Sequence, residues 1–492
     1  MTSVRTDLVT RSPQRLAADP SRVISRLFVP GQEGFEHHDS RAGTVLRRIL
    51  ALGEDEVRAS LNDIVTRFER RHRDLLGTFR RHTRELADRL DTTAELSDAR
   101  MELVGAAFTT EYAIEGAALC NPSMVAHPDQ TGIAAGSVRF VMSVRGIGEG
   151  HISSIGFRTG VVDATGAVTI DAVAPYVTAG AIVPALLDAA VLRIELSRTN
   201  DVGEGAEYVL SSLGARFTRS DLEEQLDRLQ KHRRTHGHVH ETISRIRMIA
   251  DRTYGVEFSA GTPFSERILW PAMGAEAAGM EDARFVRFVD DDGSVTFYAS
   301  YTAYSGTHIS QQLLETKDFT SFTSTPMVGS AAANKGLALF PRRVRGHFAA
   351  MSRSDRESNS FAFSDAPFAW TDAVPCQQPT QAWEALQLGN CGPPIETEAG
   401  WLMLTHGVGP MRTYRMGAVL LDLENPSHIV GQLREPLLSP AIDEQNGYVP
   451  NVVYSCGAMV HAGVLVIPYG IADAVIGFAT MPLPELLAAM DR

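Results

Sequence analysis

The chain has 492 residues and a formal net charge of −13, with 46 lysine and arginine residues against 59 aspartate and glutamate residues. This length can bury a large core without disulfide bonds. The acidic balance argues against a general nucleic-acid binder, because lysine and arginine drive binding to phosphate backbones. It leaves room for a small anionic substrate held by a few cations in a cleft.

The cysteines and the hydropathy pattern indicate a cytoplasmic protein. The four cysteines lie far apart and form no CxxC pair, so neither a zinc site nor a secreted disulfide framework is expected. Residues 1–20 contain no apolar core of a signal peptide, and no run of about 18 apolar residues occurs. HExxH, Walker and strand-following GxGxxG motifs are also missing from the sequence. We therefore expect no membrane partner and no metal or redox cofactor.

Two stretches carry apolar residues at the three-to-four spacing of amphipathic helices. The first runs from about residue 40 to 110, and the second from about 183 to 254. Their charged runs are more typical of solvated helix faces than of binding patches. We expect an N-terminal helical extension over residues 1–115 and a helical insertion at about 183–254, either of which can build a homo-oligomer.

Short apolar runs recur through residues 116–492, and each is followed by another strand-like run. Five of them end on a polar or aromatic residue, and the last four lie about 50 to 60 residues apart. This recurrence is typical of propeller blades. The sequence therefore predicts a mainly β fold, a five-bladed β-propeller, whose blade ends meet around one pocket. The five run ends are Arg145, Tyr301, Arg353, His406 and Tyr469.

Two adjacent carboxylates, Glu281 and Asp282, stand just before an apolar run. Neighbouring side chains of a strand face opposite sides, so one carboxyl can face the pocket while the other bonds backbone or a sugar hydroxyl. Cleaving a glycosidic bond takes a carboxylic acid that protonates the leaving oxygen, and inversion takes a nucleophile on the opposite face. The pair is a candidate for this acid, although such pairs are also common in surface turns.

Eight motifs occur in one order between about residues 120 and 480. They are Asn121-Pro-Ser-Met, Glu281-Asp-Ala-Arg284, Tyr301-Thr-Ala-Tyr-Ser-Gly306, Asn334-Lys-Gly-Leu-Ala-Leu-Phe-Pro341, Gly392-Pro-Pro-Ile, Thr405-His-Gly-Val408, Tyr448-Val-Pro-Asn-Val-Val-Tyr-Ser-Cys-Gly457 and Tyr469-Gly-Ile-Ala-Asp-Ala-Val-Ile-Gly477. With these motifs in this order, the chain resembles glycoside hydrolase family 130, the β-mannoside phosphorylases and β-mannosidases. The resemblance implies a five-bladed β-propeller and puts the general acid on Asp282, with Ala283 where the family has proline.

The resemblance also implies an inverting phosphorolysis. Asp282 would protonate the leaving oxygen through a mannose hydroxyl while inorganic phosphate, as cosubstrate, attacks the anomeric carbon. The products would be α-mannose 1-phosphate and a shortened acceptor. A phosphate dianion calls for guanidinium, ammonium and imidazolium donors, and Lys335, Arg353 and His406 match those positions. Substrate binding is implied for Asn121, Arg145, Glu281, Arg284, Tyr301, Tyr304, Tyr469 and Asp473, with His308 as a secondary candidate.

Two rival functions remain at this point. A β-mannosidase of the same fold would use water, with Glu357, Glu384 or Glu396 as its base. A carbohydrate-binding propeller without turnover would keep the pocket but need no acid. The linkage, β-1,2 or β-1,4, and the acceptor sugar stay open.

Overall fold

The computed structural model describes residues 8–31, 40–86, 96–198, 203–232 and 239–491. Strands prevail over helices along these residues, which confirms the prediction of a mainly β fold. The chain divides into two compact units, one of residues 1–18, 117–173 and 179–492 and the other of residues 19–116 and 174–178. None of the described helices combines the length and the apolar character needed to cross a membrane.

The smaller unit contains helices and a two-stranded antiparallel sheet in which Val23 pairs with Ala113. Its helices begin where Ser40, Asp74 and Ser97 accept a backbone N–H of the first turn, which satisfies one of the free donors there. The elements are β2 (Val23–Leu27), α1 (Arg41–Leu50), α2 (Glu54–Phe68), α3 (Leu75–Glu85), α4 (Asp98–Ala107) and β3 (Thr109–Ala113).

The first strand of the chain differs from the expected helical extension over residues 1–115. Strand β1 (Thr10–Ala17) belongs to the larger unit, where it pairs antiparallel with β30 (Val475–Pro482), Thr10 opposite Thr480. Its pattern of half-buried and exposed side chains, in Thr-Arg-Ser-Pro-Gln-Arg-Leu-Ala, is too polar for a hydrophobic pattern to reveal it. The pairing, supplied by a distant strand, decides its conformation.

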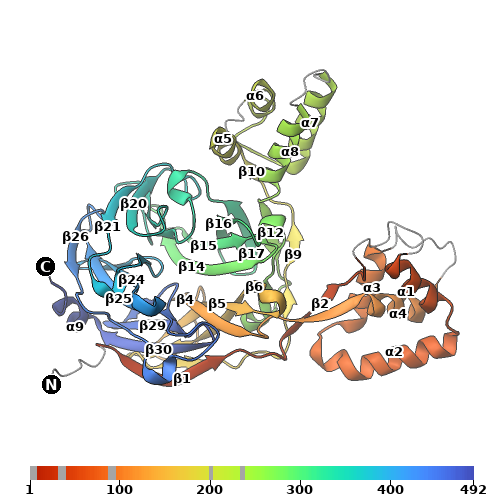
Figure 1. The fold of residues 1–492 in the computed structure, drawn as a ribbon, viewed down its shortest axis with the longest axis horizontal. Coiled ribbons are helices and arrows are strands. Elements are labelled where there is room, and N and C mark those ends of the chain that lie inside the picture. Colours follow the sequence, from red (N-terminus) through yellow and green to blue (C-terminus); the bar gives the residue numbers. More distant parts are fainter. Residues whose placement is uncertain (1–7, 32–39, 87–95, 199–202, 233–238, 492) are drawn as a thin grey trace. The chain divides into compact units, whose positions relative to one another are not determined.

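The described strands of the larger unit form separate sheets rather than one closed sheet (Figure 1). The largest has twelve strands and follows the order β4-β5-β6-β14-β15-β16-β17-β12-β9 along its main path. These strands are β4 (Ala118–Ala126), β5 (Val138–Ile147), β6 (Ser153–Val162), β9 (Ala181–Val183), β12 (Tyr254–Glu257), β14 (Gly279–Val289), β15 (Val295–Tyr304), β16 (Ile309–Thr316) and β17 (Ser321–Pro326).

Three further sheets of four or five strands follow along the chain. The first contains β18 (Ala338–Leu339), β19 (Phe348–Ser352), β20 (Asn359–Ser364) and β21 (Val374–Gln377). The second contains β22 (Gln387–Asn390), β23 (Ile395–Thr397), β24 (Gly400–Val408), β25 (Tyr414–Leu421) and β26 (Ile429–Gln432). The third joins β1 to β27 (Val453–Tyr454), β28 (Met459–His461), β29 (Val464–Ile471) and β30.

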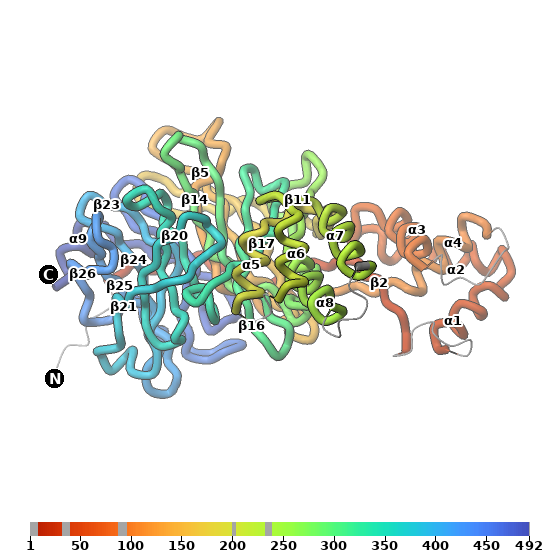
Figure 2. Tube along the Cα trace, turned by 90° about the horizontal axis from the view of Figure 1, so that it is seen from above, coloured from red at the N-terminus to blue at the C-terminus, as the bar shows by residue number. Residues whose placement is uncertain are grey.

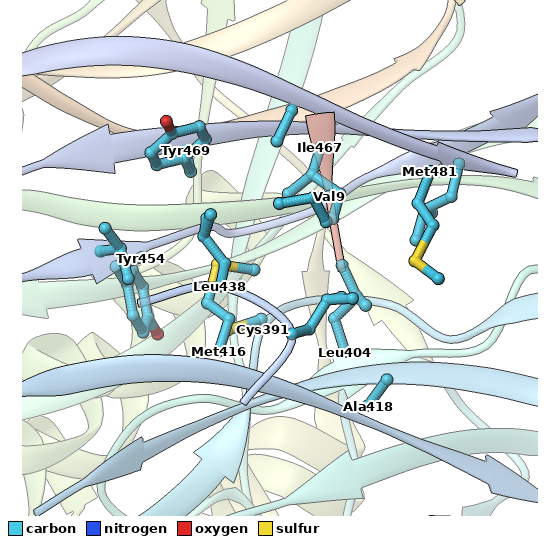
Figure 3. Packing of buried hydrophobic residues seen from close by; sticks show 14 of the residues in the cluster. Val9, Cys391, Leu404, Met416, Ala418, Leu438, Tyr454, Ile467, Tyr469 and Met481 are labelled. Carbon is cyan, nitrogen blue, oxygen red and sulfur yellow. The ribbon is translucent and has the colours of Figure 1, made fainter. Parts of the chain in front are cut away.

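Buried apolar side chains hold the last two sheets together. Figure 3 shows Leu404 and Met416 of one sheet in the same cluster as Ile467 and Met481 of the other, with Val9 beside them. Alternation along a strand turns every second side chain to one face, so a run such as Val464–Ile471 can bury a row of apolar groups. Close packing of this kind fixes the strand ends that carry polar residues.

Helices α5 (Ala189–Arg198), α6 (Glu204–Ser211), α7 (Arg219–His232) and α8 (Val239–Ala250) form a bundle between β9 and β12 in the chain (Figure 2). They fall within the segment of about 183–254 where a helical insertion is expected. Leu196, Leu226 and Ile246 are fully buried in their shared core. The bundle therefore has its own hydrophobic centre inside the larger unit.

Candidate active site

Asp282 occupies a β-bulge. The register of β14 against β15 shifts between Glu281 and Arg284, and Asp282 has a φ of 56°. The left-handed region is uncommon for a residue other than glycine, although aspartate and asparagine tolerate it best. The bulge takes Asp282 out of the regular ladder, and its side chain is buried.

Asn121 repeats this geometry one strand pair away. The register of β4 against β5 shifts between Cys120 and Ser123, and Asn121 has a φ of 47°. Its Nδ2 donates to Oδ1 of Asp282 at 2.6 Å. The backbone N–H of Phe285 donates to Oγ of Ser123 at 3.0 Å, which ties the two bulged strands together.

A single guanidinium holds both carboxylates of the pair. Arg145 donates from Nη1 to Asp282 at 3.0 Å and from Nη2 to Glu281 at 2.7 Å. Its Nε donates to Oγ of Ser153 at 2.9 Å, so all three donating nitrogens are fixed. The two carboxyls do not separate into one facing the pocket and one facing backbone, because the bulge brings both to Arg145.

The charges around Asp282 decide its protonation. Burial opposes ionisation, but Arg145, then Lys335 and Arg284, outweigh burial and hold the pKa of Asp282 well below its usual range. Hydrogen bonding from Asn121 acts in the same direction. These contacts favour the carboxylate form of Asp282, so the proton-donor role expected from the sequence requires a change that raises its pKa.

Asp473 is the carboxyl that keeps its proton more easily. It lies in the tight turn between β29 and β30, where Ala472 and Asp473 both have a φ of 48°, as a type I′ turn requires. Burial raises the pKa of Asp473 to about 6, with the negative charge of Asp282 adding to the rise and Arg145 opposing it. Two neighbouring carboxyls with separated pKa values are the usual basis for dividing acid and base roles.

Buried cations gather beside these carboxylates. Arg284 donates to the hydroxyl of Tyr454 at 2.6 Å, and Nη1 of Arg353 lies 3.4 Å from Nε2 of His406. A Cβ on Gly336 would stand 3.4 Å from Cδ of Arg353 and 3.5 Å from Nη1 of Arg284, so the backbone next to Lys335 lies close to both arginine side chains. Lys335 acts on the pKa values of both Asp282 and His406.

Polar atoms of this cation cluster lack partners. Among the described residues, Nε of Arg284, Nε of Arg353 and Oδ1 of Asn121 are buried without a hydrogen bond. Leaving such groups unpaired costs free energy, which a bound anion or sugar would recover. These orphaned atoms mark the space between carboxylates and cations as a binding site.

The surroundings of His406 favour the neutral imidazole over the imidazolium that the sequence led us to expect. Burial, then Arg353 and Arg284, hold the pKa of His406 well below its usual range. Its Nδ1 lies 3.1 Å from the carbonyl of Asn390 and must donate to it, which leaves Nε2 as an acceptor facing Arg353. Only glycine fits at the position opposite His406 in β22, since a Cβ on Gly389 would stand 2.5 Å from His406.

Tyr301 and Tyr469 are not brought to the site. Each is buried, and each hydroxyl donates to a buried carboxylate, Tyr301 to Glu276 and Tyr469 to Glu444, the latter at 2.6 Å. For Tyr301 the expected register is off by one residue. Arg145 is opposite Cys120, the residue before Asn121, and the equivalent position opposite Glu281, the residue before Asp282, is Thr302. A one-residue slip reverses the face of the sheet that a side chain occupies.

Tyr304 is the last residue of β15 and lies two residues after Thr302, so both side chains are on the same face of the sheet. It is half-buried, and its hydroxyl donates to the carbonyl of Gly306 at 2.7 Å. The secondary candidate His308 lies beyond this turn, with Nδ1 2.8 Å from the hydroxyl of Thr307. Tyr304 thus stands at the rim rather than among the residues around Asp282.

The carboxylates proposed as a hydrolytic base have other partners. Glu384 is buried and accepts the backbone N–H of Thr380 at 2.7 Å, and Glu396 pairs with Arg342 at 2.6 Å. Glu357 is exposed. None of these three forms a hydrogen bond or ion pair with a described residue of the Asp282 cluster.

Sequence reasoning missed Tyr454, Asn390 and Gly389 as members of the cluster. Tyr454 also packs edge-on against His406, with ring centroids 4.9 Å apart. It stands inside the motif Tyr448–Gly457, so the motif was a usable signal. Asn390 contributes its carbonyl to His406 and its side-chain amide to the carbonyl of Gly336, and it lies outside the recognised motifs.

Carboxylates beside buried cations, in a mainly β chain, are the parts that an enzyme needs to cleave a glycosidic bond with an anion as the attacking group. The class indicated is a carbohydrate-active enzyme. The sequence model of the glycoside hydrolase 130 family, described as β-1,4-mannooligosaccharide phosphorylase, matches residues 232–492. The chain belongs to this family, which confirms the resemblance seen in its motifs.

Two similar proteins come from Thermoanaerobacter sp. (strain X514). A 1,2-β-oligomannan phosphorylase is 35% identical over 216 residues, which are 43% of this chain and 71% of that protein. A β-1,2-mannobiose phosphorylase is 33% identical over 222 residues, 44% of this chain and 72% of that protein. Among solved structures, the β-1,2-mannobiose phosphorylase of Listeria innocua with β-1,2-mannobiose is 21% identical, covers 75% of this chain and 93% of its own, and has a TM-score of 0.42.

Proposed function

We propose that this chain is an inverting β-mannoside phosphorylase that converts a β-mannoside and inorganic phosphate to α-mannose 1-phosphate and a shortened acceptor. The observation that carries the proposal is the carboxylate of Asp282 in the field of Arg145, Lys335 and Arg284, next to buried guanidinium nitrogens, Nε of Arg284 and Nε of Arg353, that have no hydrogen-bond partner among the described residues. The names of the similar Thermoanaerobacter proteins support the same reaction and favour a β-1,2 linkage.

Phosphate is the cosubstrate, and Lys335, Arg353 and His406 receive it. Guanidinium and ammonium donors suit a dianion, and the free Nε of Arg353 gives it a donor that no protein group uses. When the phosphate oxygens draw Nη1 of Arg353 away from Nε2 of His406, this nitrogen is free to accept the one P–O–H group of the bound phosphate. Its unprotonated oxygens are then free to attack carbon.

The acid step runs through Asp282. A phosphate dianion beside Lys335 and Arg284 cancels part of the field that keeps Asp282 ionised, so its pKa rises when phosphate is bound. The protonated Asp282 then supplies a proton, through a mannose hydroxyl, to the leaving oxygen as the glycosidic bond breaks. A phosphate oxygen forms the new bond to the anomeric carbon from the opposite face. Asn121, Arg145, Glu281 and Asp473 hold the mannose hydroxyls.

This arrangement makes hydrolysis the weaker alternative. Without the dianion, Asp282 stays ionised and has no proton to give. None of the candidate bases for water, Glu357, Glu384 and Glu396, forms a hydrogen bond or ion pair with a described residue of the Asp282 cluster. A binding protein without turnover would have no use for carboxyls with separated pKa values.

We also propose that the larger unit is a five-bladed β-propeller. Three times a buried glutamate stands six residues before an asparagine or aspartate that lies in or beside the site. These pairs are Glu115 with Asn121, Glu276 with Asp282 and Glu384 with Asn390. A cavity of about 360 Å³ is lined by parts of five segments, as an axial channel would be. The segments are 124–126, 285–289, 341–342, 393–396 and 458–460.

The cellular setting is the cytoplasm, where the four free cysteines would stay reduced. Phosphorus NMR tests the reaction directly. The enzyme is incubated with β-1,2-mannobiose or β-1,4-mannobiose, with and without phosphate. We expect α-mannose 1-phosphate only when phosphate is present, and faster from the β-1,2 substrate. Release of mannose at an equal rate without phosphate, and no mannose 1-phosphate, would overturn the proposal.

A further inference from the structure

A cavity outside the Asp282 site lies between the helical insertion and the strands of the larger unit. Its volume is about 930 Å³, near the upper end of the range of about 300 to 1,000 Å³ that is usual for small-molecule sites. One wall consists of α8 with Gln230 of α7, and the other of residues 273–275 with Ser305 and Ser310.

The cavity encloses the polar face of α8. Val239, Ile246 and Ile249 of this helix are buried in the core of the insertion. His240 and Ser244, one turn apart, line the cavity instead. The sequence pattern indicates a solvated helix face. In the structure this face lies across the cavity from the wall formed by residues 273–275, Ser305 and Ser310.

The charged groups that line the cavity are already neutralised within the insertion. Arg247 pairs with Glu223 at 2.6 Å. Arg252 pairs with Glu195 at 3.1 Å, and Asp251 with Arg219 at 2.6 Å. A charged ligand would have to compete with these pairs, so the cavity favours a neutral one.

Neutral hydrogen-bonding groups remain free. Among the described residues, the side chains of Gln230, His240, Ser244 and Ser310 line the cavity without a hydrogen bond to protein. Met248, which is 60% exposed, adds an apolar surface beside them. Donors and acceptors next to apolar patches suit a sugar, whose hydroxyls and C–H faces need both.

The cavity opens at the same end of β14 as the carboxylate site. Ser305 follows Tyr304, which pairs with Gly279 at the first position of β14. Asp282 is three residues further along the strand, roughly 10 Å at the usual rise per residue. The half-buried Tyr304 is opposite Gly279 and next to Ser305, so it lies where the start of β14 meets the edge of the cavity.

We propose that this cavity is a subsite for the distal part of the acceptor chain. It makes β-mannan oligosaccharides longer than a disaccharide the preferred substrates. This inference rests on the proposed phosphorolysis, because the acceptor is the part of the substrate that phosphate releases. Family members without the helical insertion would lack this wall.

Blocking the cavity tests the inference. Ser244→Tyr fills it from α8, and Ser211→Tyr, at an exposed position of α6 outside the cavity, is the matched control. The kcat/KM for phosphorolysis is measured for a β-mannan disaccharide and tetrasaccharide. We expect Ser244→Tyr to lower the value for the tetrasaccharide about tenfold, the worth of one or two hydrogen bonds, and to leave the disaccharide within about twofold. Ser211→Tyr should change neither.

Calorimetric titration of the tetrasaccharide, in phosphate-free buffer, keeps the subsite testable if no turnover occurs. Binding that weakens in Ser244→Tyr but not in Ser211→Tyr supports the subsite. Equal kcat/KM for both lengths in the unaltered enzyme, or equal effects of Ser244→Tyr on both, would overturn it. If the unaltered enzyme phosphorolyses no substrate but its binding still depends on chain length, the result counts against the proposed reaction and not against the subsite.

Discussion

Asn121 and Asp282 occupy matching β-bulges, and the amide of Asn121 donates to the carboxylate of Asp282 at 2.6 Å. Both residues have left-handed backbone conformations, with φ values of 47° and 56°. Such conformations cost free energy and persist where the surrounding structure imposes them. The contact between two strained positions is therefore a built feature of the site.

Removing the Asn121 amide should impair turnover more than folding. Asn121→Gly keeps the left-handed backbone without strain and deletes the donor to Asp282. A hydrogen bond to a charged group contributes about 1.5 to 3 kcal/mol, so we expect kcat/KM to fall about tenfold to a hundredfold. Steady-state kinetics measure this, and thermal unfolding checks the fold. Unchanged kinetics would show that Asp282 is positioned without Asn121.

Asp282→Asn tests the acid itself. The amide retains the size of the side chain but cannot release a proton to the leaving oxygen. We expect kcat to fall by about 10² to 10⁴, the usual contribution of a general acid. Substrates with a good leaving group, such as an aryl β-mannoside, should lose less, because they need less protonation. A variant with the same loss for both kinds of substrate would contradict this role.

Asp473 should make stability depend on pH between its unfolded and folded pKa values, about 3.8 and about 6. The folded chain binds the proton more tightly, so this contribution to stability is full below about pH 4 and is lost as the pH rises through 6. The loss is at most about 3 kcal/mol. Asp473→Asn removes it. In urea unfolding, the variant should therefore gain stability relative to the unaltered protein between pH 4 and 7.5. A constant difference across that range would contradict the buried, protonated state.

His406 should discriminate phosphate from sulfate. Its Nδ1 donates to the carbonyl of Asn390, so Nε2 is an acceptor that phosphate can use once Nη1 of Arg353 turns to the phosphate oxygens; sulfate has no proton to donate at neutral pH, whereas hydrogen phosphate has one. We expect sulfate to inhibit weakly, with a Ki well above the KM for phosphate. In His406→Gln, the side-chain amide can donate a hydrogen bond to the bound anion. The ratio of the Ki for sulfate to the KM for phosphate should therefore decrease. Strong sulfate inhibition of the unaltered enzyme would show that His406 becomes protonated instead.

Tyr301 should matter for stability rather than for catalysis. Tyr301→Phe leaves the buried Glu276 carboxylate with one fewer donor, at a cost of about 1 to 3 kcal/mol. We expect a lower unfolding temperature and a kcat within about twofold of the original. Tyr304→Ala serves as the contrast, because it removes a rim residue and should raise KM with little effect on stability.

The sequence brought together, through their motifs, several residues that the structure also groups, while their roles remain predictions. Asn121, Arg145, Asp282 and Arg353 all follow recognisable strand or motif patterns, and the structure groups each of them with partners expected in the site. Tyr301 was misplaced because apolar runs locate a strand end only to within a residue, and one residue changes the face.

The charge of His406 was also beyond the sequence. The sequence suggested a cationic His406 because a phosphate dianion calls for cationic donors. Its protonation depends instead on burial and on Arg353 and Arg284, which come from other parts of the chain. Strand β1 is a similar case, since only its pairing with β30 explains why a polar segment is extended.

That pairing has a consequence for synthesis. Thr10 and Thr480 are opposite one another, so β1 finds its partner only after all the residues between them have been synthesised. Contacts this distant in sequence form slowly. Until then β1 remains an unpaired edge, and the nascent protein is exposed to wrong strand pairing throughout its translation.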